Sequence, residues 1–312
     1  MSAPANALSP ASATAASARA GILLMLLGMS LFTINDALGK WLVTDYPVAM
    51  LLAVRSLFGA VLLLPLILRD GVGRVFAVRR LPLHLLRVGC VSTEIACFYW
   101  AVRSLPLADV MTIYMAAPLI VTALSVPLLK EKVGWRRWAA VLVGFAGVVL
   151  VLNPTGAFDP IPSLVGLFGA MVFSLGLVTT RMLREDGTLT LVSYQTIGTG
   201  VIGGAVASSG WVMPGLGDFL LLGLLGVVAL AGHAAMNRSL ALSPAAVVVP
   251  FQYVAIVWAV ILDLVVWGTA PSVPVLAGAA LIIGSGLFVF YREQRTAHGV
   301  AADSTPNLGP GA

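Results

Sequence analysis

Three ionisable side chains stand inside otherwise apolar segments: Asp36, Arg55 and Glu94. Charged groups are costly among apolar neighbours, and inside a membrane they usually mark a substrate or ion pathway. A carboxyl removed from water favours its protonated form, so either acid can take up and release a proton. An arginine fork suits a carboxylate or phosphate on a bound molecule. The chemistry these residues suggest is proton transfer beside the recognition of a charged solute.

Each of these groups also has a purely structural interpretation. Asp36 and Lys40 are four residues apart and can pair on one helical face, with Lys40 reaching outward. The alternative is a site for a zwitterion or a proton-coupled carboxylate, with Asn35 beside it. Arg55 either pairs with Asp36 or Glu94 or contacts a ligand directly. Glu94 either couples protons or donates a hydrogen bond to a neighbouring helix.

Aromatic and amide side chains extend this set. Tyr114 lies one turn before Pro118, which frees a backbone carbonyl, an arrangement common at substrate cavities. Pro250 does the same beside Gln252 and Tyr253, which we expect in the site rather than in the core. These residues predict solute contacts in two separate helices.

Four further residues have either an undecided or a structural role in this interpretation. His233 lies on one face with Asn237 and is either a cavity residue or a satisfied donor between helices. We expect Tyr99 and Trp100 in an aromatic belt at the membrane surface. The sequence does not decide the role of Asp263.

The composition indicates a membrane protein. Of 312 residues, 59% are hydrophobic and 10% charged, with a mean hydropathy of +1.00. Soluble domains carry about 25% charged residues. The net charge of +5 does not indicate nucleic acid binding, since the charges lie between apolar runs. We find no metal-binding spacing, cofactor motif or catalytic pair, which argues against an enzyme.

The apolar runs predict an all-α membrane protein with ten spanning helices. A span needs roughly 20 residues. With the N-terminus in the cytoplasm, every Lys and Arg except Lys40, Arg55, Arg87 and Arg103 falls on the cytoplasmic side, which favours both termini inside. The expected helices cover residues 21–42, 46–68, 82–103, 108–129, 135–152, 163–182, 189–209, 218–237, 244–267 and 274–291.

A weak internal repeat divides the chain into two halves. Arg103-Ser104-Leu105 has a counterpart in Arg238-Ser239-Leu240. Five helices per half is an odd number, so the second half enters the membrane in the opposite orientation. Such inverted repeats hold a central site near the bilayer midplane. We expect a disordered tail at 1–19, repeats at 20–153 and 162–292, and a second disordered tail at 293–312.

A set of short motifs follows in a fixed order along the chain: Asn35 to Lys40, Tyr99-Trp100-Ala101, Leu105 to Ala108, Ala117-Pro118-Leu119, Lys130 to Trp135, Pro250 to Tyr253 and Trp258. In these motifs the chain resembles the EamA-type drug/metabolite transporters over about residues 20–292. No single motif is decisive, but their order and spacing are specific. One departure is Trp267-Gly268-Thr269, which stands where the family usually has an acidic residue.

The resemblance implies a secondary carrier of the bacterial inner membrane that works by alternating access as a monomer or homodimer. Its members include carriers of riboflavin and of S-adenosylmethionine, and amino-acid exporters. We expect a small organic solute, such as a flat heterocycle like riboflavin, with lipid as the other partner. S-adenosylmethionine, or amino-acid or drug export, is the alternative within the family. A membrane enzyme or a lipid flippase is the alternative class.

Overall fold

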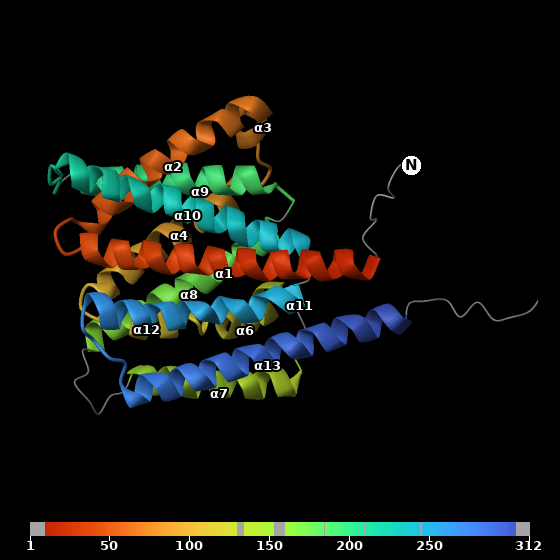
Figure 1. The fold of residues 1–312 in the computed structure, drawn as a ribbon. Coiled ribbons are helices and arrows are strands. Elements are labelled where there is room, and N and C mark those ends of the chain that lie inside the picture. The colour runs from red at the N-terminus through yellow and green to blue at the C-terminus, as the bar shows by residue number, and fades with distance from the viewer. Residues whose placement is uncertain are drawn as a thin grey trace, which may run out of the picture.

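The computed structural model describes residues 10–129, 134–152, 160–183, 185–208, 210–243 and 245–303, and these parts contain helices and no strand. The helices run roughly alongside one another in a single bundle (Figure 1). Their bounds are α1 Pro10–Leu42, α2 Val48–Asp70, α3 Val72–Phe76, α4 Leu81–Val102, α5 Leu107–Tyr114, α6 Ala117–Leu129, α7 Trp135–Leu152, α8 Pro160–Met182, α9 Thr188–Ala207, α10 Leu216–Leu242, α11 Ala245–Val248, the 3₁₀ helix η1 Val249–Tyr253, α12 Val254–Val266 and α13 Val273–Asp303.

Eight helical segments of the described chain are long and apolar enough to cross a bilayer. Two shorter apolar helices, Trp138–Leu152 and Pro250–Val266, accompany them. Many large apolar side chains on the outside of the bundle are exposed, Val265 at 78% and Leu142 at 68% among them. In water such a surface would be unstable, whereas lipid tails solvate it. The structure therefore supports a multi-pass membrane protein.

Two expected helices are interrupted. The segment 108–129 is divided at Met115 and Ala116 into α5 and α6, and the segment 244–267 consists of α11, η1 and α12. Proline has no N–H to donate and its ring crowds the preceding turn. Pro118 follows the first break directly, and Pro250 lies at the start of η1. The expected spans at 108–129 and 244–267 thus each consist of shorter helices, and the prolines that interrupt them are the two singled out from the sequence.

The positions of the first and last helices agree with an even number of membrane crossings. α1 begins and α13 ends at the same end of the bundle (Figure 1). Both helices also reach into the segments expected as tails, since α1 begins at Pro10 and α13 ends at Asp303. At the opposite end, the Tyr46 hydroxyl donates to the Asp218 carboxylate at 2.6 Å, and this bond raises the pKa of the phenol. It ties the α1–α2 connection to the first turn of α10.

Small residues allow the closest helix contacts. At Gly226 of α10, an added Cβ would collide with the backbone carbonyl of Arg55 in α2. Backbone atoms cannot move aside as a flexible side chain does. The approach of α10 therefore fixes the part of α2 that carries Arg55.

Replacing Gly226 by Ala is expected to lower the stability of the protein by about 1–3 kcal/mol, the usual cost of overpacking. Thermal unfolding in detergent measures the effect. Gly204→Ala in α9 is the matched control, because no atom lies within 4 Å of a Cβ added there. An equal loss in both variants would contradict the close contact of α2 and α10.

Candidate functional site

The central candidate site gathers three charged side chains from three helices. Asp36 lies on α1, Arg55 on α2 and Glu94 on α4, each well inside its helix and each half-buried. Their charges lie within electrostatic range of one another. Within the described part of the chain, no direct ion pair joins Arg55 to either acid. None of these three charges is therefore neutralised by a direct ion pair with another of them.

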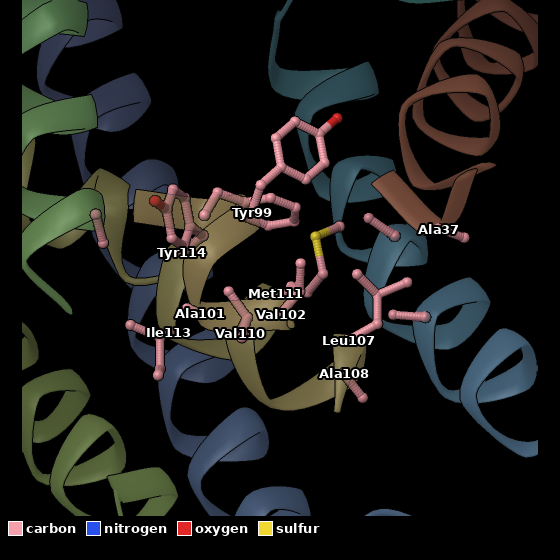
Figure 2. Close-up of a cluster of buried hydrophobic side chains, with 14 of the residues drawn as sticks. Ala37, Tyr99, Ala101, Val102, Leu107, Ala108, Val110, Met111, Ile113 and Tyr114 are labelled. Atoms are coloured by element: carbon pink, nitrogen blue, oxygen red, sulfur yellow. The ribbon is translucent and has the colours of Figure 1, made fainter. Parts of the chain in front are cut away.

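Tyr99 connects two members of this group. Its hydroxyl lies 3.4 Å from the Asn35 amide nitrogen and 3.5 Å from a terminal nitrogen of Arg55, both in donor positions. Its side chain is 1% exposed, so the expectation that Tyr99 belongs to a surface belt was wrong. The next residue, Trp100, is 43% exposed, in agreement with that expectation. Tyr99 and Tyr114 lie at the edge of an apolar cluster with their hydroxyls turned away from it (Figure 2).

Replacing Tyr99 by Phe removes the shared acceptor and leaves the ring in place. We expect a loss of solute affinity of about twofold to tenfold, the value of one hydrogen bond at about 0.5–1.5 kcal/mol, with little change in melting temperature. Solute binding to the purified variant measures this. Unchanged affinity would show that the position of Arg55 does not depend on this hydroxyl.

Tyr114 supports the backbone beside Glu94. Its hydroxyl donates to the main-chain oxygen of Glu94 at 3.2 Å, and its ring meets Phe98 edge-on at 5.2 Å. A Cβ at Gly169 of α8 would collide with this hydroxyl, so glycine is what leaves it room. With 7% of its surface exposed, Tyr114 holds α4 and α8 around Glu94.

Lys40 does not pair with Asp36. Its amino group lies 3.0 Å from the carboxylate of Asp263 and 4.4 Å from the centre of the Trp267 ring. Lys40 is 8% exposed and so does not reach outward. An ion pair between two packed helices shields both charges from lipid better than the predicted ion pair along one helix would.

Asp263 has the role that the sequence left open. Its carboxylate also accepts the backbone N–H groups of Leu107 and Ala108 at 3.0 and 2.7 Å. These are first-turn amides of α5, which no intrahelical acceptor satisfies and whose dipoles favour a negative charge. Asp263 thus joins α12, α5 and α1 at one end of the bundle.

The remaining predicted residues are distributed differently. His233 on α10 packs edge-on against Phe32 with ring centres 4.8 Å apart, and its electrostatic contact with Arg55 places it near the central group. Gln252 and Tyr253 lie half-buried in η1. The Tyr253 hydroxyl is directed at Gly286 of α13, where an added Cβ would meet it. No recorded hydrogen bond of the described residues links these two side chains to the central group.

Sequence reasoning missed a second polar group around Arg87 on α4. The guanidinium donates to the Thr180 hydroxyl at 2.7 Å, the Leu191 carbonyl at 3.0 Å and the Gln195 amide oxygen at 2.7 Å. One turn earlier, His84 contacts the Asp186 carboxylate at 2.9 Å. The acceptors lie about a hundred positions away in the chain. The sequence therefore shows an Arg within an apolar segment but not its partners. These contacts join α4 to α8 and α9. No group of residues in the described chain has the arrangement of a metal site.

Comparison with known proteins shows which proteins this chain is similar to. Residues 19–153 match the model of the EamA-like transporter family. Over this stretch the chain is similar to that family. The resemblance to EamA-type drug/metabolite transporters is thereby confirmed. A solved crystal structure has the same fold, with a TM-score of 0.60 at 20% identity over 90% of this chain and 99% of the other.

Curated relatives of this chain are named as metabolite transporters. An S-adenosylmethionine uptake transporter of Rickettsia prowazekii is 26% identical over 88% of this chain and 94% of its own length. A riboflavin transporter of Vibrio cholerae is 27% identical with the same coverage of both chains. A pseudopaline exporter of Pseudomonas aeruginosa is 25% identical over 85% of this chain and 94% of its own.

Proposed function

We propose that the protein is a secondary carrier that moves a small organic metabolite across a bacterial inner membrane by alternating access. The observation that carries this proposal is the group of Asp36, Arg55 and Glu94, half-buried well inside three apolar helices without a direct ion pair. Unpaired ionisable groups at such depth are expensive, and a solute pathway accounts for them. The transporter names of the relatives support the same function.

The proposed architecture is two inverted repeats of five helices, at 20–153 and 162–292, with both termini in the cytoplasm. Its support is the pattern of packing. Exchanging the two halves replaces α1 by α8 and α10 by α4. The helices α1 and α10 are in extensive contact with each other, and so are α8 and α4. The pairs α2 with α9, α7 with α13 and α5 with α12 each map onto themselves. The interrupted helices α5–α6 and α11–α12 also occupy corresponding positions, as the binding helices of inverted-repeat carriers do.

The charges of the site favour a solute with a heterocycle and a cationic or zwitterionic end. Two carboxyl groups face one guanidinium, so in the state in which both acids are ionised a positive group on the solute balances the excess negative charge. The Phe32–His233 pair offers aromatic surface to a flat ring. An S-adenosylmethionine-like solute satisfies both features, whereas a riboflavin-like solute uses the aromatic surface alone. Charge balance therefore favours the first over the flat neutral heterocycle expected from the sequence.

Counterflow in proteoliposomes tests the function. Vesicles loaded with unlabelled S-adenosylmethionine, and others loaded with riboflavin, are diluted into the same labelled compound. A carrier produces transient accumulation of label above equilibrium, which a membrane enzyme does not. A lipid flippase would instead move labelled phospholipid between leaflets and show no counterflow. Absence of counterflow with both compounds and with amino acids would contradict the proposal.

A further inference from the structure

A cleft of about 490 Å³ opens between α7 and α13, away from the central site. Trp135, Arg136 and Val143 line it from α7, and Gly284 and Phe288 line it from α13. Its size is within the range of about 300–1,000 Å³ typical of small-molecule sites. The two helices form the margin of the bundle, where they pack against each other (Figure 1).

Small residues explain why the cleft lies at one end of this helix pair. At Gly147 an added Cβ would lie 2.8 Å from the carbonyl oxygen of Gly278, so the two backbones are in near contact there. Toward Trp135 the helices leave the cleft between them. At Gly284 no atom lies within 4 Å of an added Cβ, which leaves the cleft open.

The two ends of the cleft differ in chemistry. Most of its lining is apolar and exposed, with Phe288 at 44%, Val143 at 48% and Trp135 at 74%. Arg136 stands at the first turn of α7, with its guanidinium 5.4 Å from the Trp135 ring. An apolar groove that ends at an arginine and a tryptophan matches an acyl chain below an anionic headgroup.

We propose that this cleft binds an anionic phospholipid, with an acyl chain along Val143, Gly284 and Phe288 and the phosphate at Arg136. Charge complementarity selects this occupant over a zwitterionic lipid, because a choline headgroup brings a positive charge toward Arg136. It also selects it over a second copy of the chain, whose α7–α13 face would bring the same arginine. The site would couple the outer helix pair to the composition of the surrounding leaflet.

The test is lipid titration of the purified full chain in neutral detergent, read by native mass spectrometry. Phosphatidylglycerol is compared with phosphatidylcholine of the same acyl chains. We expect phosphatidylglycerol to be retained preferentially. Arg136→Gln should weaken its binding by about fivefold, the factor for one basic group at an anionic surface. Gly284→Leu should fill the cleft and reduce retention of either lipid.

Two matched variants control for general effects. Gly204→Leu adds the same side chain at an equally open helix position, and Arg79→Gln removes an exposed cation between α3 and α4. Both should bind phosphatidylglycerol as the unaltered chain does. Equal retention of the two lipids, or equal loss in the control variants, would overturn the proposal. A dimer that Gly284→Leu dissociates and that excludes lipid would show a protein interface instead and would overturn it as well.

Discussion

Replacing Glu94 by Gln is expected to abolish accumulation driven by a pH gradient and to leave the fold intact. Gln has the same shape, and the half-buried side chain makes no recorded direct ion pair whose loss would destabilise the described bundle. It has no titratable proton, so the coupling step through this carboxyl is lost. Uptake of labelled solute into proteoliposomes with an imposed pH gradient measures the effect, which should fall to the level of protein-free vesicles.

Two comparisons make this result specific to coupling. Counterflow without a gradient should persist in the Glu94→Gln variant, since it requires the site to move but no net proton transfer. Glu185→Gln makes the same chemical change at an exposed carboxyl between α8 and α9 and should behave like the unaltered protein. Full pH-driven uptake by Glu94→Gln would exclude Glu94 as the coupling group.

The second large effect is expected at Asp263, which is fully buried. Asp263→Ala leaves the charge of Lys40 buried and unpaired and leaves the amides of Leu107 and Ala108 without their acceptor. Removing one partner of a buried pair costs about 3–5 kcal/mol. Each unsatisfied amide adds about 1–3 kcal/mol, though such costs are not additive. We expect a large fall in melting temperature or loss of the folded protein from the membrane.

A pair of milder variants separates the charge from the hydrogen bonds. Asp263→Asn keeps an acceptor oxygen for one of the two α5 amides but no longer balances Lys40, so it should be destabilised, though less than Asp263→Ala. Adding Lys40→Met removes the unpaired charge and should restore much of the stability lost in Asp263→Asn. Thermal unfolding of both variants in detergent is the measurement. If the double variant is less stable than Asp263→Asn alone, the ion pair is not what makes this position sensitive.

The positions of the apolar helices and their interruptions follow from local properties of the sequence. Segment length, hydropathy and the prolines at 118 and 250 are visible without any partner. They do not specify the residues at which each helix is interrupted. Pro118 interrupts its helix at Met115 and Ala116 because the chain closes a tighter turn there, with the Ala116 amide bonded to the Ile113 carbonyl.

Pairing between distant residues was the part that sequence could not supply. A single helix offers Lys40 the nearby Asp36, and only the packed bundle offers it Asp263, 223 residues away. Tyr99 looked like a belt residue because its neighbour Trp100 is one, yet Tyr99 is buried and Trp100 is exposed. The types of residue at the central site were predictable, whereas their partners depended on helix packing.

The most direct test of the central claim is whether water reaches the Asp36–Arg55–Glu94 group from both sides of the membrane. Cys97 lies one turn from Glu94 on the same face of α4 and is half-buried, so a variant with Cys90→Ser reports on this site alone. The account predicts labelling of Cys97 by a membrane-impermeant maleimide from the outside and from the inside in turn. Cys90, which is buried, should resist when it is the sole thiol. Labelling of Cys97 only by a lipid-soluble maleimide would mean that no aqueous pathway reaches the group, and alternating access at this site would be excluded.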